Sequence, residues 1–160
     1  QEMMEKQGLP AYEISNHARH GEESQHNLVY WRYGDYAGIG PGAHGRLTID
    51  GLKQATRAHK APELWMEWVQ SKGHGADPFE VFDSFKRGQE MLMMGLRLLE
   101  GVLLDAFLKE TQTPVSQFIH PDRLQTLQDE GLLELTNHHL RATAAGRQRL
   151  NAVLAYVVSQ

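Results

Sequence analysis

The spacing of hydrophobic residues changes about a third of the way along the chain. The first part carries short apolar runs separated by polar and glycine-rich stretches, which is typical of strands and loops. Leu9–Ser15 alternates and predicts a short strand, and the apolar run Tyr36–Ile39 predicts a buried one. Arg46–Ile49 predicts an edge strand, because the hairpin signal Asp50-Gly51 follows it. The polar stretch 53–60 is expected to be a connection.

After this connection the apolar positions recur at helical spacing. Pro62 suits the first turn of a helix. The apolar stripe of that helix consists of Leu64, Trp65, Trp68 and Val69. Asp77 is the expected N-cap of the next helix, which carries apolar residues on two faces up to Leu99. A helix of that kind is expected to be central, with other elements packed on both sides.

The last third of the chain predicts the order helix, helix, two-stranded wing, helix. Short helices are expected over residues 103–108 and 121–130. Strands over 132–135 and 139–142 would form the wing, and Thr143 would cap the final helix. This order is similar to a winged helix that begins at about residue 103. The expected fold class is therefore α/β and mainly helical.

Composition narrows the function classes. The 160 residues are 41% hydrophobic and 22% charged, as in an ordinary globular protein, and the net charge of −4 argues against nucleic acid as a partner. The absence of Cys excludes disulfides, a thiol nucleophile and a cysteine-bound iron–sulfur cluster within this sequence. No apolar run approaches the roughly 18 residues of a membrane span, and no signal peptide is visible. Nine His residues supply a common ligand for metals and haem iron.

Two short runs hold most of the chemistry. The first extends from His26 to Trp31 and the second from Tyr36 to His44. If the first run is helical, His26 and Tyr30 lie four residues apart and share one face. In the second run, Gly40-Pro41-Gly42 must form a tight turn, where glycine lets a ligand approach the backbone closely.

Each candidate site has a plainer alternative. His26 could bind haem iron, with Tyr30 and Trp31 against the porphyrin, or it could hydrogen-bond the neighbouring loop. His17, His20 and His26 could bind zinc, but no Cys or acidic ligand stands at a matching interval, which favours polar loop histidines. The pair Ser15 and His17 has no nucleophile elbow around it. The winged-helix-like end could bind DNA, but its acidic residues favour a structural cap.

Six segments in order resemble a known family. They are Tyr12–Ala18, His26–Trp31, Gly38–His44, Met94–Val102, Gly131–Glu134 and the end of the chain from Leu140 to Leu154. Together these segments resemble the C-terminal part of radical S-adenosylmethionine (SAM) proteins of the oxygen-independent coproporphyrinogen III oxidase type. The run His-Asn-x-x-Tyr-Trp is similar to that of the haem-chaperone branch. Departures from the usual pattern stand at His17, His20, Gln25 and Gly45.

The resemblance implies a fold in two parts. Residues 1–52 would supply the last strands of a partial (β/α) barrel, and residues 53–160 a helical C-terminal domain. The opening Glu2–Gln7, the end of a helix capped by Gly8, is expected of a chain cut from a longer protein. The cut strand edges would dock on the helical domain, pair with a second copy or be partly disordered.

The resemblance also implies cofactors and partners. A longer parent would hold SAM and a [4Fe–4S] cluster on a Cys-x-x-x-Cys-x-x-Cys motif, so this chain alone is expected to be inactive. The parent would act on coproporphyrinogen III by oxidative decarboxylation, or bind haem and deliver it to accepting proteins, in the cytoplasm. His26, Tyr30 and Trp31 would contact haem, with His26 on the iron. Gly40, Gly42, Ala43 and His44 would line the cavity for SAM or substrate. The alternative is a free-standing winged-helix-like binding or regulatory module without catalytic activity.

Overall fold

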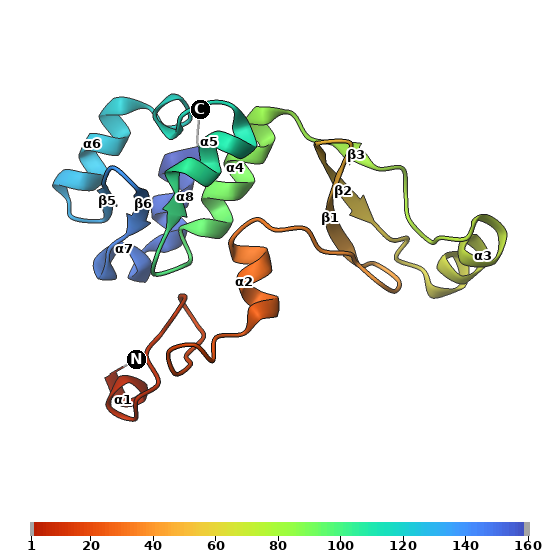
Figure 1. The fold of residues 1–160 in the computed structure, drawn as a ribbon, viewed down its shortest axis with the longest axis horizontal. Coiled ribbons are helices and arrows are strands. Elements are labelled where there is room, and N and C mark those ends of the chain that lie inside the picture. Colours follow the sequence, from red (N-terminus) through yellow and green to blue (C-terminus); the bar gives the residue numbers. More distant parts are fainter. Residues whose placement is uncertain (1, 159–160) are drawn as a thin grey trace. The chain divides into compact units, whose positions relative to one another are not determined.

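The computed structural model describes residues 2–158, which form two compact units (Figure 1). The first unit combines Gln1–Tyr33 with Ser84–Gln160, and the second is Gly34–Asp83. The expected boundary at residue 52 refers to a barrel in a longer parent and stays a prediction. No helix among residues 2–158 is long and apolar enough to cross a membrane.

The first unit is mainly helical and contains one small sheet. The antiparallel sheet has the order β4-β6-β5, formed by Val102–Leu103, His139–Ala142 and Leu133–Leu135. The helices are α1 (Glu2–Lys6), α2 (Gln25–Trp31), α4 (Ser84–Gly95), α5 (Leu104–Thr111), a 3-10 turn η1 (Val115–Gln117), α6 (Pro121–Asp129), α7 (Ala144–Gln148) and α8 (Leu150–Val158).

The core of the first unit surrounds α4, which contacts α2, α5, α8 and β4. Phe107, Leu96 and Leu140 are fully buried in this core, and Leu92 is nearly so. The ring of Phe118 packs directly against the backbone at Gly88, so a Cβ at position 88 would collide with that ring. The expectation of a central helix with neighbours on more than one side is confirmed.

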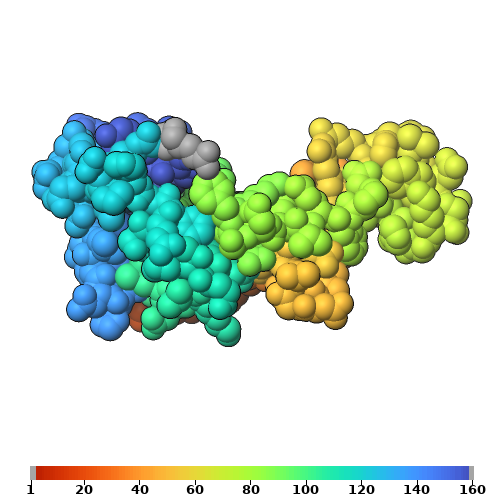
Figure 2. Space-filling view, turned by 90° about the horizontal axis from the view of Figure 1, so that it is seen from above, coloured from red at the N-terminus to blue at the C-terminus, as the bar shows by residue number. Residues whose placement is uncertain are grey.

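The second unit is an antiparallel sheet and one helix. The sheet order is β1-β2-β3, formed by His44–Ile49, Leu52–Arg57 and Glu80–Val81. Asp50 and Gly51 have φ angles of 52° and 77°, as the tight hairpin turn between β1 and β2 requires. Helix α3 (Pro62–Lys72) has no buried residue, and its atoms, yellow to yellow-green, lie at the surface in the view of Figure 2.

Several sequence predictions are confirmed. The mixed α/β, mainly helical class is correct, and helices occur near 26–32, from Pro62 and from Pro121. The two wing strands occur as β5 and β6, and Thr143 caps a helix. The elements of the last third follow the expected order, while their assignment to the winged-helix class stays a prediction.

Two predicted strands are wrong. Leu9–Ser15 makes only isolated bridges, Ala11 to His17 and Glu13 to Leu98. In 36–39 only Tyr36 forms a bridge, with Arg46, and Ile39 is 88% exposed rather than buried. Strand pairing needs a continuous partner edge, and neither segment has one within the residues that the structure describes.

Three further predictions are corrected by cross-strand pairing and by helix ends. Residues 53–60 are not a connection, because most of them form β2 in register with β1. Asp77 caps no helix, since β3 pairs with β2 at Gln54 and Ala55 and α4 begins only at Ser84. The final helix is two helices, α7 and α8, which are separated at Arg149.

Candidate functional site

Helix α2 presents His26 and Tyr30 side by side. The Ser24 hydroxyl caps the helix by accepting a hydrogen bond from the Asn27 backbone N–H (3.4 Å). A hydrogen bond of 2.6 Å joins Tyr30 Oη and His26 Nε2, and the two rings meet edge to face at 4.7 Å. His26 is exposed. The imidazole is therefore oriented by Tyr30 and open to a ligand, while its Nε2 is engaged by the phenol.

Trp31 occupies a different side of α2. Five residues after His26, it is rotated by about 140° around a helix of 3.6 residues per turn. The guanidinium of Arg97 lies 5.3 Å from the centre of the indole ring. The indole Nε1 is buried and has no hydrogen-bond partner among the residues that the structure describes. The structure thus brings His26 and Tyr30 together and directs Trp31 towards α4.

Trp31 lines a small cavity, which we call the Trp31 cavity. Its volume is about 220 Å³, and Met91, Gly95, Val102, Leu103 and Ala106 supply most of its wall. Gly101, Arg32 and Glu100 complete the wall. The lining is therefore almost entirely apolar, apart from one ion pair.

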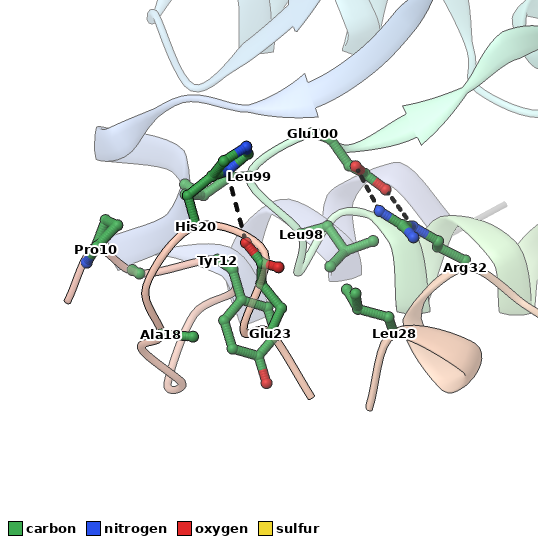
Figure 3. Close-up of a pocket in the computed structure, with 11 residues that line it drawn as sticks. Pro10, Tyr12, Ala18, His20, Glu23, Leu28, Arg32, Leu98, Leu99 and Glu100 are labelled. Atoms are coloured by element: carbon green, nitrogen blue, oxygen red, sulfur yellow. Dashed lines mark hydrogen bonds and ion pairs between the residues drawn. The ribbon is translucent and has the colours of Figure 1, made fainter. Parts of the chain in front are cut away.

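A second cavity, the Tyr12 cavity, lies beside α2 and has a volume of about 440 Å³ (Figure 3). Tyr12, Leu28 and Leu98 line it, together with Arg32 and Glu100. The side-chain amide of Asn27 donates a hydrogen bond to Tyr12 Oη (3.2 Å). Asn27 of the His-Asn-x-x-Tyr-Trp run therefore supports the wall of this cavity.

The sequence does not predict the ion pair of Arg32 and Glu100. Arg32 Nε and Nη2 donate to the two carboxylate oxygens of Glu100 at 2.7 and 3.0 Å. The hydrogen bond to Glu100 raises the pKa of Arg32 above its usual value. The two residues are 68 positions apart, so no spacing rule relates them. Only the packing of α2 beside the loop that precedes β4 reveals the pair.

The residues expected to line a cavity for SAM or substrate belong to the second unit. Gly40 and Gly42 have φ angles of 101° and 74°, which confirms the tight turn. The Gly42 N–H donates to the His59 carbonyl (3.0 Å), and the Ala43 carbonyl accepts from the Ala58 N–H (2.8 Å). His44 is exposed at the start of β1. The turn is thus fixed by neighbours in its own unit, and its role towards a ligand stays a prediction.

The side chains fit some of the groups that the sequence suggests and do not fit others. One exposed imidazole at His26 fits a single axial bond to haem iron. The sequence holds no Cys for an iron–sulfur cluster. His17 Nδ1 lies 3.1 Å from the Leu9 carbonyl oxygen, and residues 2–158 contain no group of three or more His, Cys, Asp or Glu that could hold a metal. The zinc alternative therefore has no support.

The chain matches a known family model and is similar to several known proteins. Residues 86–149 match the family described as the HemN C-terminal domain. The chain is 35% identical over 173 residues to radical S-adenosyl methionine domain-containing protein 1, mitochondrial, of Dictyostelium discoideum, covering 96% of this chain and 39% of that protein. It is 30% identical over 154 residues to the heme chaperone HemW of Escherichia coli (strain K12), and the match covers 96% of this chain and 39% of that protein.

A solved structure shares the fold. Coproporphyrinogen III oxidase (HemN) from Escherichia coli, described as a radical SAM enzyme, matches with a TM-score of 0.69 over 99% of this chain and 39% of that chain. At 14% identity this likeness concerns the fold alone. The chain spans about two fifths of the length of these relatives. The chain carries the HemN C-terminal domain over residues 86–149, and its homologues are radical S-adenosyl methionine domain-containing proteins and HemW heme chaperones.

Proposed function

We propose that this chain is the haem-binding part of a haem-handling protein, in which His26 would bind the haem iron. The observation that carries the proposal is the exposed imidazole of His26, oriented on α2 by its 2.6 Å hydrogen bond to Tyr30. The similarity to a protein named heme chaperone supports it, because that similarity covers 96% of the chain at 30% identity. The free-standing winged-helix module is not favoured.

The protein's own groups define how haem would be held. Haem supplies an iron atom that accepts an imidazole nitrogen. His26 offers Nδ1 while Tyr30 holds Nε2, or offers Nε2 once the phenol turns away. A partner on the second ring nitrogen orients an imidazole ligand and raises its basicity. Tyr30 is therefore a positioning residue in the first arrangement and a competitor in the second.

The test is a titration with haemin followed by the Soret band. We expect His26→Ala to lose the spectral shift of the wild type. His138→Ala, which removes another exposed imidazole of the same unit, should keep it. A wild-type shift in His26→Ala would contradict the proposal.

Tyr30→Phe then distinguishes the two nitrogens. If Nδ1 binds iron, the loss of the supporting hydrogen bond weakens binding by about 10- to 100-fold, as for other partners of metal-bound histidines. If Nε2 binds iron, the same substitution removes a competitor and strengthens binding. An unchanged affinity would mean that the Tyr30 hydroxyl has no part in the site.

The wider activity belongs to a longer protein. We propose that such a protein adds the cluster and SAM, that Gly40, Gly42, Ala43 and His44 face its cofactor or substrate, and that haem-accepting proteins are its partners. Product analysis with coproporphyrinogen III, on a form that contains the cluster cysteines, would distinguish an oxidase from a haem carrier. Formation of the decarboxylated product would favour the oxidase. The cytoplasmic location is part of this proposal, although some relatives are named mitochondrial.

A further inference from the structure

The two cavities beside α2 share one wall. Arg32 and Glu100 line both the Trp31 cavity and the Tyr12 cavity. The side chain of Arg32 is 52% exposed and that of Glu100 is 40% exposed, so each can be reached from solvent. The ion pair is therefore an accessible polar group in the wall that the two cavities share.

The wall of the Trp31 cavity carries one charged donor that a ligand can reach, the guanidinium of Arg32. Trp31 Nε1 is buried and does not face an open ligand position. The planar guanidinium matches the two oxygens of a carboxylate, as its two hydrogen bonds to Glu100 show. Arg32 therefore suits a ligand that ends in a carboxylate.

The rest of the Trp31 cavity suits an apolar body. Met91, Val102, Leu103 and Ala106 form its wall. Its volume of about 220 Å³ exceeds the roughly 150 Å³ of a cavity known to admit benzene. A single ring or a short alkyl chain therefore fits this space.

We propose that the Trp31 cavity and its Arg32–Glu100 wall form a binding site for a small apolar carboxylate, distinct from the haem position at His26. Arg32 binds the carboxylate, and the hydrocarbon part fills the cavity. When no ligand is bound, the carboxylate of Glu100 takes the place of the ligand's carboxylate and accepts both hydrogen bonds from Arg32. Arg97, over the indole face, holds the ring of Trp31 in place.

The test compares 3-phenylpropionate with the uncharged 3-phenylpropanol by ligand-observed NMR and by amide shift mapping. We expect the carboxylate to bind the wild type more tightly than the alcohol, with shifts at Met91 and Val102. Glu100→Gln should bind the carboxylate at least fivefold more tightly, because Arg32 loses its internal partner. Arg32→Gln should bind both compounds equally.

Glu110→Gln is the matched control, because it neutralises the ion pair of Glu110 with Arg87 elsewhere in the same unit, and it should behave as the wild type. Equal binding of both compounds to the wild type, or a Glu100→Gln affinity no higher than that of Glu110→Gln, would overturn the proposal.

Discussion

At the residue scale, the backbone of Gly101 passes so close to β6 that no side chain fits. Its φ angle is 74°, and a Cβ there would collide with the Leu140 carbonyl oxygen and with Arg141. Gly131 has a similar φ angle of 66°, but the space around its missing Cβ is open. Substituting each glycine in turn therefore distinguishes the free-energy cost of the backbone conformation, which both positions share, from the cost of the collision, which only Gly101 has.

We expect Gly101→Ala to lower the free energy of unfolding by about 3–5 kcal/mol, since it adds a backbone collision to an unfavourable φ angle. Gly131→Ala should cost only about 1 kcal/mol, because it meets the unfavourable φ angle alone. Chemical denaturation followed by circular dichroism measures both. Equal losses in the two variants would show that the collision relaxes without cost.

The carboxylate of Asp35 accepts hydrogen bonds from several groups, which change its pKa. Burial acts to raise its pKa, but hydrogen bonds from Lys53 Nζ (2.6 Å) and from the Thr48 N–H (2.7 Å) and hydroxyl (2.9 Å) outweigh burial, so the pKa lies below its usual value. Lys53 itself is only 4% exposed. The carboxylate thus links β1 and β2 from the loop that precedes them.

A lowered pKa predicts a pH dependence of known sign. The ionised form of Asp35 stabilises the folded state above the unfolded pKa of about 3.9, and this contribution is lost as the pH falls through the lower folded value. Asp35→Asn should therefore be less stable than the wild type near pH 7, with a difference that shrinks below about pH 4. Thr48→Val, which removes one donor to Asp35, should show a smaller effect of the same sign. Urea unfolding at several pH values tests this, and a difference that is constant with pH would contradict it.

At the element scale, Thr143 connects the wing to α7. Its hydroxyl accepts from the Gly146 N–H (3.1 Å), as an N-cap does, and donates to the Gly131 carbonyl (2.6 Å). One side chain therefore begins a helix and closes the turn after α6. The sequence predicts Thr143 as a cap, but it does not predict the hydrogen bond to Gly131, which depends on tertiary structure.

We expect Thr143→Ala to destabilise the fold by about 1–2 kcal/mol, because it removes the cap and leaves a carbonyl without its donor. Thr143→Ser keeps the hydroxyl and should restore most of the stability. Thermal unfolding of the three proteins provides the measurement. A serine variant as unstable as the alanine variant would assign the effect to the lost methyl group.

At the scale of the whole molecule, the hydrophobic core is unequally divided. All the buried residues of the main apolar cluster belong to the first unit. In the second unit, Phe82 and Ala58 are the buried hydrophobic residues among those described, and α3 buries none of its side chains. Because burial of apolar surface supplies most of the stability of a helix in a protein, the two units should resist opening differently.

Hydrogen exchange should reveal this difference directly. The amides of α4, which buries Met91 and Leu92, should be protected far longer than those of α3. The helices have comparable lengths, 12 and 11 residues, so length does not explain a difference. Equal protection in α3 and α4 would show that α3 has a stabilising partner that the described contacts do not include.

Local signals in the sequence determined where several turns and helices of this protein begin or end. Asp50-Gly51 predicted the hairpin turn, Pro62 and Pro121 the starts of two helices, and Thr143 a cap, because each depends on the preferred backbone angles or hydrogen bonds of nearby residues. The run from His26 to Trp31 predicted a helix with His26 and Tyr30 together, because helical geometry alone sets that pairing.

Tertiary structure decided the features that depend on residues far apart in the chain. Pairing with neighbouring strands makes the largely polar segments β2 and β3 adopt strand structure. The apolar residues 36–39 form only one isolated bridge and therefore no strand. The same long-range packing joined Arg32 to Glu100 and turned Trp31 towards α4, away from the face of His26. A sequence pattern records what each segment prefers, but a pair 68 residues apart forms only when the packing of the whole unit brings both partners to one place.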